Sequence, residues 1–209
     1  MKQYDKLSER LIATTLQEGE FVLRSGRVSN YKIECDNIKS KSRLFKQTTQ
    51  SLGNLITERF FDCDAIVTIA NGANRLAIPV AKHASDHLGH EVCAYQSFKS
   101  HNSDGFGISK GNIHLRNKQI VVVDDVFSYG TNASTVAELC DKWSKIHDAI
   151  GSVLGIATIF NRNPDGLDTV RISSHNEGES LDIPVVSLVK YPIATVEQDK
   201  SLSILYDNM

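Results

Sequence analysis

The stretch from residue 120 to residue 132 constrains the fold of this chain more than any other part of the sequence. Its first four residues, Ile120-Val121-Val122-Val123, are consecutive and apolar, which is typical of a strand buried on both faces of a parallel sheet. Two carboxylates, Asp124 and Asp125, stand where that strand is expected to end. A loop of small polar residues follows, and residues 133–147 then show helical periodicity. The pattern predicts a strand, an acidic pair, a tight turn and a helix in direct succession.

This succession favours a sugar phosphate as ligand. A small-residue turn before a helix offers backbone N–H groups and a helix N-terminus to a phosphate. Adjacent carboxylates hold a hydrated Mg²⁺ ion or the hydroxyl groups of a sugar. Two carboxylates that are merely solvated at a strand end are the plain alternative. A phosphorelay receiver would carry such a pair at its first strand, and the G-x-G-x-x-G fingerprint of a dinucleotide site is absent.

The composition describes a globular chain without a strong electrostatic field. Its 209 residues, 41% of them hydrophobic, are enough to bury a full core in one α/β domain. The 23 basic and 25 acidic residues nearly balance, so we expect neither a nucleic-acid partner nor a membrane partner. Residues 1–16 carry charges throughout, and the cysteines are far apart with no CxxC pair. These features predict reduced thiols in a cytoplasmic protein.

Alternating periodicities predict an α/β fold with a mostly parallel sheet flanked by helices. Helices are expected over 4–18, with Gly19 as the stop, and over 42–61, 76–88 and 133–147. Besides the strand in the 119–147 unit, strands are expected over 21–23, 28–34, 64–70, 92–98 and 150–160, with 183–189 as an edge strand. The first two should form a hairpin around Ser25-Gly26-Arg27. Residues 99–112 lack periodicity and predict a flexible lid or binding loop.

Three further segments carry candidate binding residues. The loop at 71–75 follows a buried strand, where ligands of open α/β sheets bind, and it contains Gly72 and Arg75. Lys99 and His101 begin the long loop and would bring a cation and a proton donor over a polyanion if it closes as a lid. Three arginines adjoin strands and would suit a carboxylate: Arg24, Arg27 and Arg162. Taken alone, each of these features is more often part of an ordinary turn or of the solvated surface than part of a binding site.

The segment Val122 to Thr131 resembles the phosphoribosyl-pyrophosphate (PRPP) motif of the type I phosphoribosyltransferases. Residues 20–31, Glu-Phe-Val-Leu-Arg-Ser-Gly-Arg-Val-Ser-Asn-Tyr, resemble the N-terminal hairpin of orotate phosphoribosyltransferase within that family. Residues 99–102, Lys-Ser-His-Asn, are similar to the end of its hood loop, and Phe160-Asn161-Arg162 to its Asp-Arg pair. The match runs over about residues 10–165. It implies the type I phosphoribosyltransferase fold as a single domain over 1–209, with a base-binding hood at 1–40 and a catalytic lid at 99–112.

The chain departs from the family pattern at several positions. Tyr95 and Gln96 stand where the hood normally has Arg-Lys. Lys32 and Ile33 replace the aromatic pair that packs on the pyrimidine. The phosphate loop has unusual residues, and the loop at 71–75 is longer and more polar than the usual form. Two lost hood cations weaken the expected clamp on pyrophosphate.

The resemblance implies a role for each matching residue. Catalysis would fall to Lys99, His101, Asp124 and Asp125. PRPP would be bound by these four together with Arg24, Arg75, Val126, Phe127, Ser128, Tyr129, Gly130, Thr131 and Asn132. The base would meet Arg24, Lys32, Ile33, Ser128 and Arg162. The cofactor would be Mg²⁺ carried by PRPP, with no direct protein ligand and contact to Asp124 or Asp125 through water.

Three functions stay open on the sequence. The first is the transfer of a phosphoribosyl group from PRPP to orotate, which gives orotidine 5′-phosphate and pyrophosphate in pyrimidine synthesis. The second is the same transfer to another nucleobase, favoured by the missing aromatic pair. The third is a non-catalytic PRPP-binding regulator, which the altered hood permits but which would call for a basic surface that the composition lacks. The resemblance further implies a homodimer with shared active sites.

Overall fold

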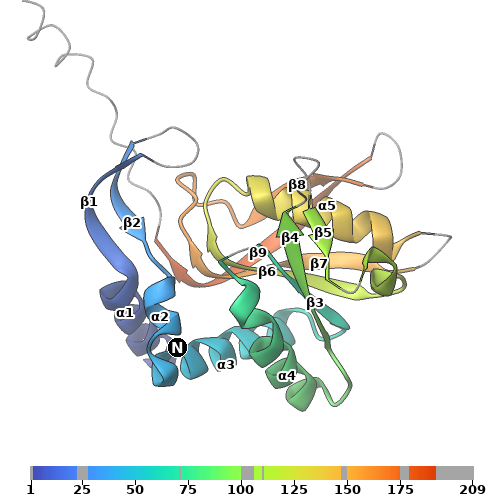
Figure 1. Ribbon diagram of the computed structural model, residues 1–209, viewed down its shortest axis with the longest axis horizontal. Coiled ribbons are helices and arrows are strands. Elements are labelled where there is room, and N and C mark those ends of the chain that lie inside the picture. Colours follow the sequence, from blue (N-terminus) through green and yellow to red (C-terminus); the bar gives the residue numbers. More distant parts are fainter. Residues whose placement is uncertain are drawn as a thin grey trace, which may run out of the picture.

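The computed structural model describes residues 2–22, 28–70, 72–99, 106–109, 111–146, 150–174 and 179–191 (Figure 1). Its helices are α1 (Lys2–Thr15), α2 (Asp36–Lys39), α3 (Ser42–Arg59), α4 (Ala77–Leu88) and α5 (Thr131–Ser144), with 3-10 turns η1 (Asn74–Leu76) and η2 (Asn112–Leu115). Its strands are β1 (Leu16–Val22), β2 (Val28–Ile33), β3 (Ala65–Thr68), β4 (Cys93–Lys99), β5 (Phe106–Ile108), β6 (Gln119–Phe127), β7 (Ser152–Asn161), β8 (Thr169–Ser173) and β9 (Ser180–Lys190).

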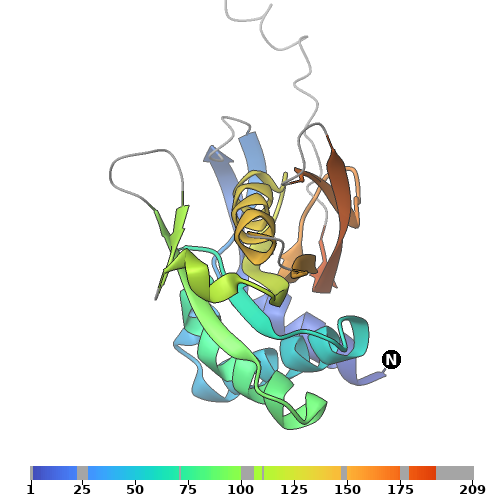
Figure 2. The same ribbon diagram turned by 90° about the vertical axis from the view of Figure 1, so that its right-hand side faces the viewer.

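Seven strands form one sheet in the order β5-β4-β3-β6-β7-β9-β8. The five inner strands pair in parallel, and the outer two, β5 and β8, pair antiparallel with their neighbours. Figure 2 shows the β4–β5 hairpin at one side of the molecule and β8 and β9 at the other, with α5 between them. The predicted mostly parallel α/β sheet is therefore confirmed.

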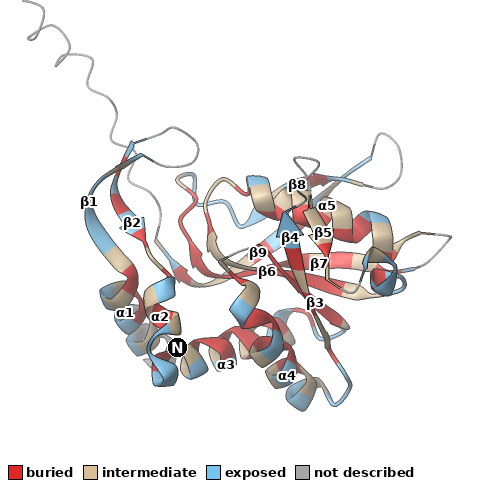
Figure 3. Cartoon of the chain, viewed as in Figure 1, coloured by how far each residue is buried: buried red, intermediate tan, exposed pale blue. Residues whose placement is uncertain are grey.

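Helices cover both faces of the sheet, and the strand β6 contributes to both of the resulting cores. Val121 and Val123 pack in the core that also holds side chains of α3 and α4. Ile120 and Val122 pack in the core that holds α5. All four are fully buried, as the red centre of the sheet in Figure 3 illustrates. The unbroken apolar run arises because β6 has no solvent-facing side here.

The predicted N-terminal hairpin is confirmed as β1 paired antiparallel with β2, although its turn at 25–27 lies outside the described residues. Its first strand begins earlier than predicted, at Leu16, because Leu16 pairs with Ile33 and ends the helix at Thr15. Gly19 was predicted to stop this helix, but it does not. It lies inside β1 with φ of 149°, where the register with β2 shifts between Glu18 and Phe21.

Two other predictions were wrong in part. The strand expected at 183–189 as an edge is the inner strand β9, because β8 pairs with its outer side and is itself the edge strand. The aperiodic segment 99–112 is not loop throughout. Residues 106–108 form β5 against β4, and η2 begins at Asn112. The remainder of that lid, residues 100–105 and 110, lies outside the described residues.

The four cysteines are free thiols, as the spacing predicted. Cys35, Cys63 and Cys140 are buried, and burial raises the pKa of each thiol, which disfavours the reactive thiolate. No helix among the described residues is long and apolar enough to cross a membrane.

Candidate active site

The acidic pair lies inside β6 and not after it. The strand was expected to end near Val123, but it continues to Phe127 because β7 runs alongside it, with Val126 opposite Phe160. The backbone N–H of Asp125 donates to Oδ1 of Asp124 at 2.9 Å. This bond fixes the Asp124 carboxylate against the backbone of Asp125 at the carboxyl end of the central strand, the usual position of a ligand site in such sheets.

The surroundings of Asp125 shift the pKa of its carboxyl. Burial raises its pKa, and the Lys39 ammonium is the largest influence that lowers it again. Lys39 lies at the end of α2, its side chain only 8% exposed, and it forms an ion pair with Asp36 at 2.5 Å. The thiol of Cys35, just before α2, is also within electrostatic reach of the pair. The short helix α2 thus lies beside the acidic pair, which the sequence did not predict.

The loop between β3 and α4 meets the acidic pair, as expected from its place on the sheet. A Cβ built on Gly72 would lie 2.3 Å from Oδ2 of Asp125, so only glycine fits between the loop and that carboxylate. Arg75, farther along this loop, lowers the pKa of Asp36 in α2 slightly through its charge, after the larger influence of Lys39. The loop is held to β4 through Asn74, whose backbone oxygen accepts a bond from the side chain of Gln96 at 2.9 Å.

The small-residue turn precedes α5 as predicted, and the helix begins at Thr131, two residues earlier than expected. Gly130 adopts φ of 80°, a left-handed conformation that favours glycine, and its carbonyl accepts the N–H of Ser134. The turn is bonded to the segment that follows β7, because the side-chain amide of Asn163 donates to the carbonyl of Ser128 at 2.9 Å. Val126 and Phe127, which lie beyond the predicted end of the strand, are the last residues of β6.

Arg162 is buried, with 4% of its surface exposed, directly after β7. Its backbone N–H donates to the carbonyl of Phe127, which ties it to the end of β6. Its guanidinium lies 4.8 Å from the ring centroid of Tyr31, and one terminal nitrogen donates to the hydroxyl of Ser29 at 3.4 Å. The buried Nε has no hydrogen-bond partner among the described residues. A buried cation with an unsatisfied donor is well suited to an anionic ligand.

Three tyrosines gather around Arg162. Tyr31 and Tyr191 meet edge to face at 5.2 Å, and the Tyr31 hydroxyl donates to the carbonyl of Tyr191 at 3.1 Å. The phenol of Tyr129 is within electrostatic reach of both Arg162 and Tyr31. The loop predicted to hold phosphate therefore also presents a side chain toward the buried arginine.

The remaining predicted base residues lie on opposite faces of β2. Ile33 is buried with Tyr31 in the core shared by α3 and α4. Lys32 is exposed and pairs with Glu34 at 2.6 Å. Arg24 and Arg27 lie outside the described residues.

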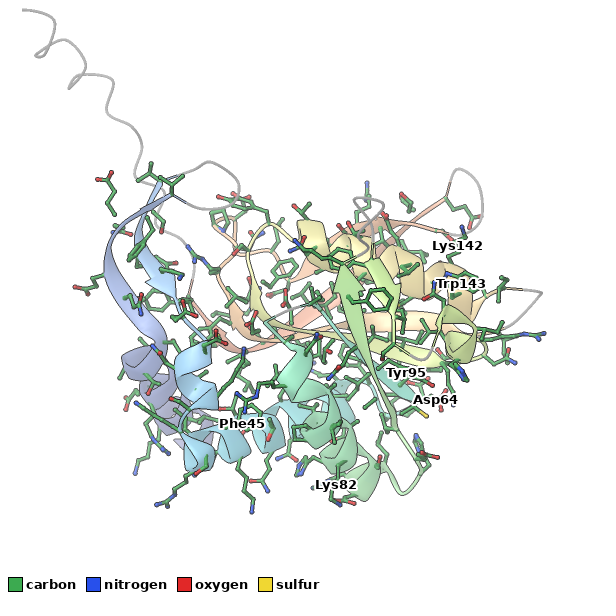
Figure 4. The ribbon with its side chains drawn as sticks, viewed as in Figure 1. Phe45, Asp64, Lys82, Tyr95, Lys142 and Trp143 are labelled. Carbon is green, nitrogen blue, oxygen red and sulfur yellow. The ribbon has the colours of Figure 1, made fainter. Side chains whose placement is uncertain are left out.

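Tyr95 and Gln96, which stand where the resemblance predicts Arg-Lys, both make contacts within the protein. Tyr95 is buried on β4, and its hydroxyl donates to the carbonyl of His114 at 3.3 Å (Figure 4). The side-chain amide of Gln96 donates to the carbonyl of Asn74, as described above. Lys99 is exposed as the last residue of β4, at the start of the predicted lid, while His101 lies outside the described residues.

The side chains around Asp124 and Asp125 suit a metal ion that is bound jointly with a substrate, and not one that is coordinated by protein side chains alone. Among the described residues no group of three or more His, Cys, Asp or Glu side chains is placed to hold one. Mg²⁺ keeps several waters and commonly uses one or two carboxylates together with substrate phosphates. Two adjacent carboxylates beside a phosphate loop fit that mode.

No family model matches the chain. Curated relatives are similar to it along most of its length. The orotate phosphoribosyltransferase of Xylella fastidiosa (strain 9a5c) is 27% identical over 195 residues, covering 90% of this chain and 84% of that protein. The orotate phosphoribosyltransferase of Tropheryma whipplei (strain Twist) is 27% identical over 168 residues, covering 80% and 75%.

Solved structures share the fold at lower identity. Orotate phosphoribosyltransferase from Aeropyrum pernix aligns with a TM-score of 0.56 at 18% identity, covering 90% of this chain and 93% of that one. The Mycobacterium tuberculosis enzyme of the same name gives 0.55 at 20%, covering 90% and 95%. An adenine phosphoribosyltransferase gives 0.57 at 16%, covering 88% and 99%. These likenesses confirm the predicted fold class, and the relatives confirm the resemblance to orotate phosphoribosyltransferase.

Proposed function

Because this chain has the type I phosphoribosyltransferase fold and resembles the orotate enzymes of that family over most of its length, we propose that it transfers the phosphoribosyl group of PRPP to orotate. The products are orotidine 5′-phosphate and pyrophosphate. The base nitrogen forms a bond to C1 of the ribose as the bond from C1 to the pyrophosphate oxygen breaks. The reaction is that of a pentosyltransferase and needs no covalent enzyme intermediate.

The sugar phosphate of PRPP is assigned to the end of β6. Asp124 and Asp125 accept hydrogen bonds from the ribose hydroxyls, which fixes C1 relative to the incoming base. The turn from Ser128 to Gly130 and the first N–H groups of α5 hold the 5′-phosphate, because they are backbone donors at a helix N-terminus. Residues 126, 127, 129, 131 and 132 shape this loop.

Pyrophosphate is assigned to the side of the site where the β3–α4 loop meets the acidic pair. Gly72 permits the close approach of backbone to Asp125, and Arg75 of the same loop would supply positive charge to the pyrophosphate. Lys99 and His101 reach the same group from the lid, where negative charge develops as the bond to C1 breaks. Mg²⁺ bound with PRPP would neutralise part of that charge, held through water to Asp124 or Asp125.

Arg162 is the observation that favours orotate over other bases. Orotate differs from uracil by a carboxylate, and the Arg162 guanidinium is a buried cation with an Nε donor that no described residue satisfies. Leaving such a donor unpaired costs free energy, which a bound carboxylate would recover. A neutral base such as adenine or uracil offers no matching charge. Arg24, Lys32, Ile33 and Ser128 remain proposed neighbours of the base.

A transferase for another base is the second candidate. It is favoured by Lys32 and Ile33, which replace an aromatic pair on β2 and place one exposed cation and one core side chain there. The third candidate is a non-catalytic regulator that binds PRPP, and no specific contact among the described residues favours it.

The deciding experiment is a pyrophosphate-release assay with PRPP, Mg²⁺ and a panel of bases that contains orotate, uracil, adenine and guanine. Release with orotate alone supports the proposal. Release with another base supports the second candidate, and PRPP binding without release supports a regulator. Arg162→Gln, which keeps polarity but removes the charge, should raise the KM for orotate and leave the KM for PRPP unchanged.

We propose in addition that the protein acts in the cytoplasm as a homodimer whose active sites are shared. Its four free cysteines agree with a reducing compartment. Sedimentation equilibrium tests the dimer, and a single species of monomer mass at assay concentration would contradict it.

A further inference from the structure

The ring of Tyr31 is contacted from two directions by side chains that come from distant parts of the chain. The guanidinium of Arg162 lies 4.8 Å from its centroid, and the ring of Tyr191 meets it nearly at right angles, 88°, with centroids 5.2 Å apart. Both geometries are the favourable ones for a cation over a ring and for two aromatic rings. Tyr31 thus contacts both Arg162 and Tyr191 through its ring.

Backbone bonds fix Tyr191 in this arrangement. Its N–H donates to the carbonyl of Asn161 at 2.8 Å, and its carbonyl accepts the Tyr31 hydroxyl at 3.1 Å. Asn161 immediately precedes Arg162. The backbone of Tyr191 and the backbone that carries Arg162 are therefore fixed relative to each other, and substitutions of the Tyr191 side chain leave both backbone groups in place.

Two residues of β2 hold the guanidinium. It lies over the ring of Tyr31 and has the Tyr31 side-chain hydroxyl as a hydrogen-bond partner. It also has a long bond, 3.4 Å, to the hydroxyl of Ser29, which itself donates to the carbonyl of Tyr31. No carboxylate of the described residues pairs with Arg162. An arginine side chain has considerable rotamer freedom, so its orientation here depends on the packing of Tyr31.

We propose that Tyr191 is a positioning residue for the base site, because it packs the ring of Tyr31 against Arg162 and so holds the guanidinium with its Nε turned to the carboxylate of the base. This inference rests on the proposed function and deepens it. It assigns the discrimination between a carboxylated pyrimidine and uracil to three residues, Tyr31, Arg162 and Tyr191. A preorganised donor binds its partner with a smaller loss of side-chain entropy than a mobile one.

Two variants separate the ring from the hydroxyl of the positioning residue. Tyr191→Leu removes the edge-to-face contact, and Tyr191→Phe keeps it. We expect Tyr191→Leu to raise the KM for orotate by about three- to tenfold, with the KM for PRPP unchanged, since one aromatic contact is lost. Tyr191→Phe should restore the wild-type value. In an Arg162→Gln background, Tyr191→Leu should change the orotate KM no further, because the two residues act as one unit.

The orientation of Arg162 is measured independently of turnover by the ¹⁵N resonance of its Nε–H group, assigned by its absence from Arg162→Gln. A slowly exchanging signal is expected in the wild type and in Tyr191→Phe, and a shifted or rapidly exchanging one in Tyr191→Leu. Equal signals in all three chains overturn the inference, as does an equal rise of both KM values. Absence of orotate turnover in the wild type refutes the proposed function instead, and the resonance then still decides whether Tyr191 positions Arg162.

Discussion

Gly72, in the loop after β3, and Asp125, in β6, lie so close together that no side chain fits between them. A Cβ built on Gly72 would lie 2.3 Å from Oδ2 and 2.8 Å from Cγ of Asp125. The β3–α4 loop and the acidic pair of β6 are thereby one site, in which pyrophosphate and ribose of PRPP are assigned to neighbouring positions.

Gly72→Ala is expected to displace the Asp125 carboxylate and to lower PRPP affinity by about tenfold or more, since the clash involves a short side chain with little room to turn. Isothermal titration with PRPP and Mg²⁺ measures it. Asp125→Asn should show a similar loss, and the double variant should be little worse than either single one. Additive losses would mean that Gly72 acts elsewhere.

Lys39 should set the acid limit of activity. Burial raises the pKa of Asp125 and the Lys39 ammonium lowers it, so Lys39→Met is expected to raise that pKa further. Because the ionised carboxylate accepts the ribose hydroxyls, activity falls as pH drops through this pKa. The acid limb of kcat/KM for PRPP should therefore move to higher pH in Lys39→Met.

The matched control for this shift is Lys41→Met, which removes an exposed cation two residues away whose ammonium contacts the hydroxyl of Thr14. Its acid limb should coincide with that of the wild type. Equal movement of both variants, or none in Lys39→Met, would show that Lys39 does not govern Asp125.

Lys99 is expected to act on the departing pyrophosphate from the start of the lid. Lys99→Ala should lose about a hundredfold or more in turnover, because a cation that stabilises developing charge is removed, while PRPP still binds. Lys82→Ala removes an exposed lysine of α4 as a control. Stopped-flow or steady-state turnover beside PRPP titration tests the assignment, and unchanged turnover in Lys99→Ala would contradict it.

Asn163 joins the phosphate loop to the segment after β7. Its amide donates to the carbonyl of Ser128 at 2.9 Å, and its Oδ1 accepts the N–H groups of Asp165 and Leu167. Asn163→Ala should lower the free energy of unfolding by about 1–3 kcal/mol, since buried backbone groups lose their partners, and should weaken PRPP binding. Urea unfolding and titration measure the two effects. Wild-type values for both would exclude this bracing role.

The sheet and the acidic pair were predictable because their signals are local. The run at Ile120–Val123 is apolar on both faces, and the acidic pair follows it directly in the chain. The helix predicted over 76–88 likewise ends at Leu88, and Gly89 follows it with φ of 74°. Sequence periodicity was misleading where pairing decided the outcome, as at Gly19, which the register of β1 and β2 carries into a strand.

The base side of the site could not be predicted in the same way. Tyr31 and Tyr191 are 160 positions apart, and nothing near Tyr191 marks it as a site residue. Lys39 belongs to a four-residue helix that places it beside Asp125 only after folding. Asn163 had a usable signal, because the sequence Asn-Pro-Asp-Gly at 163–166 is a turn signature in which an asparagine bonds the backbone that follows.

The central claim is that Asp124 and Asp125 hold the ribose of PRPP while Arg162 selects orotate. The most direct measurement is the rate of orotidine 5′-phosphate formation from PRPP, Mg²⁺ and orotate by the wild-type chain, beside the Asp124→Asn/Asp125→Asn double variant. Product formation by the wild type, with a loss of about a hundredfold or more in the double variant, is the predicted result. A wild-type chain that forms no orotidine 5′-phosphate, or a double variant that forms it at the same rate, would contradict the account.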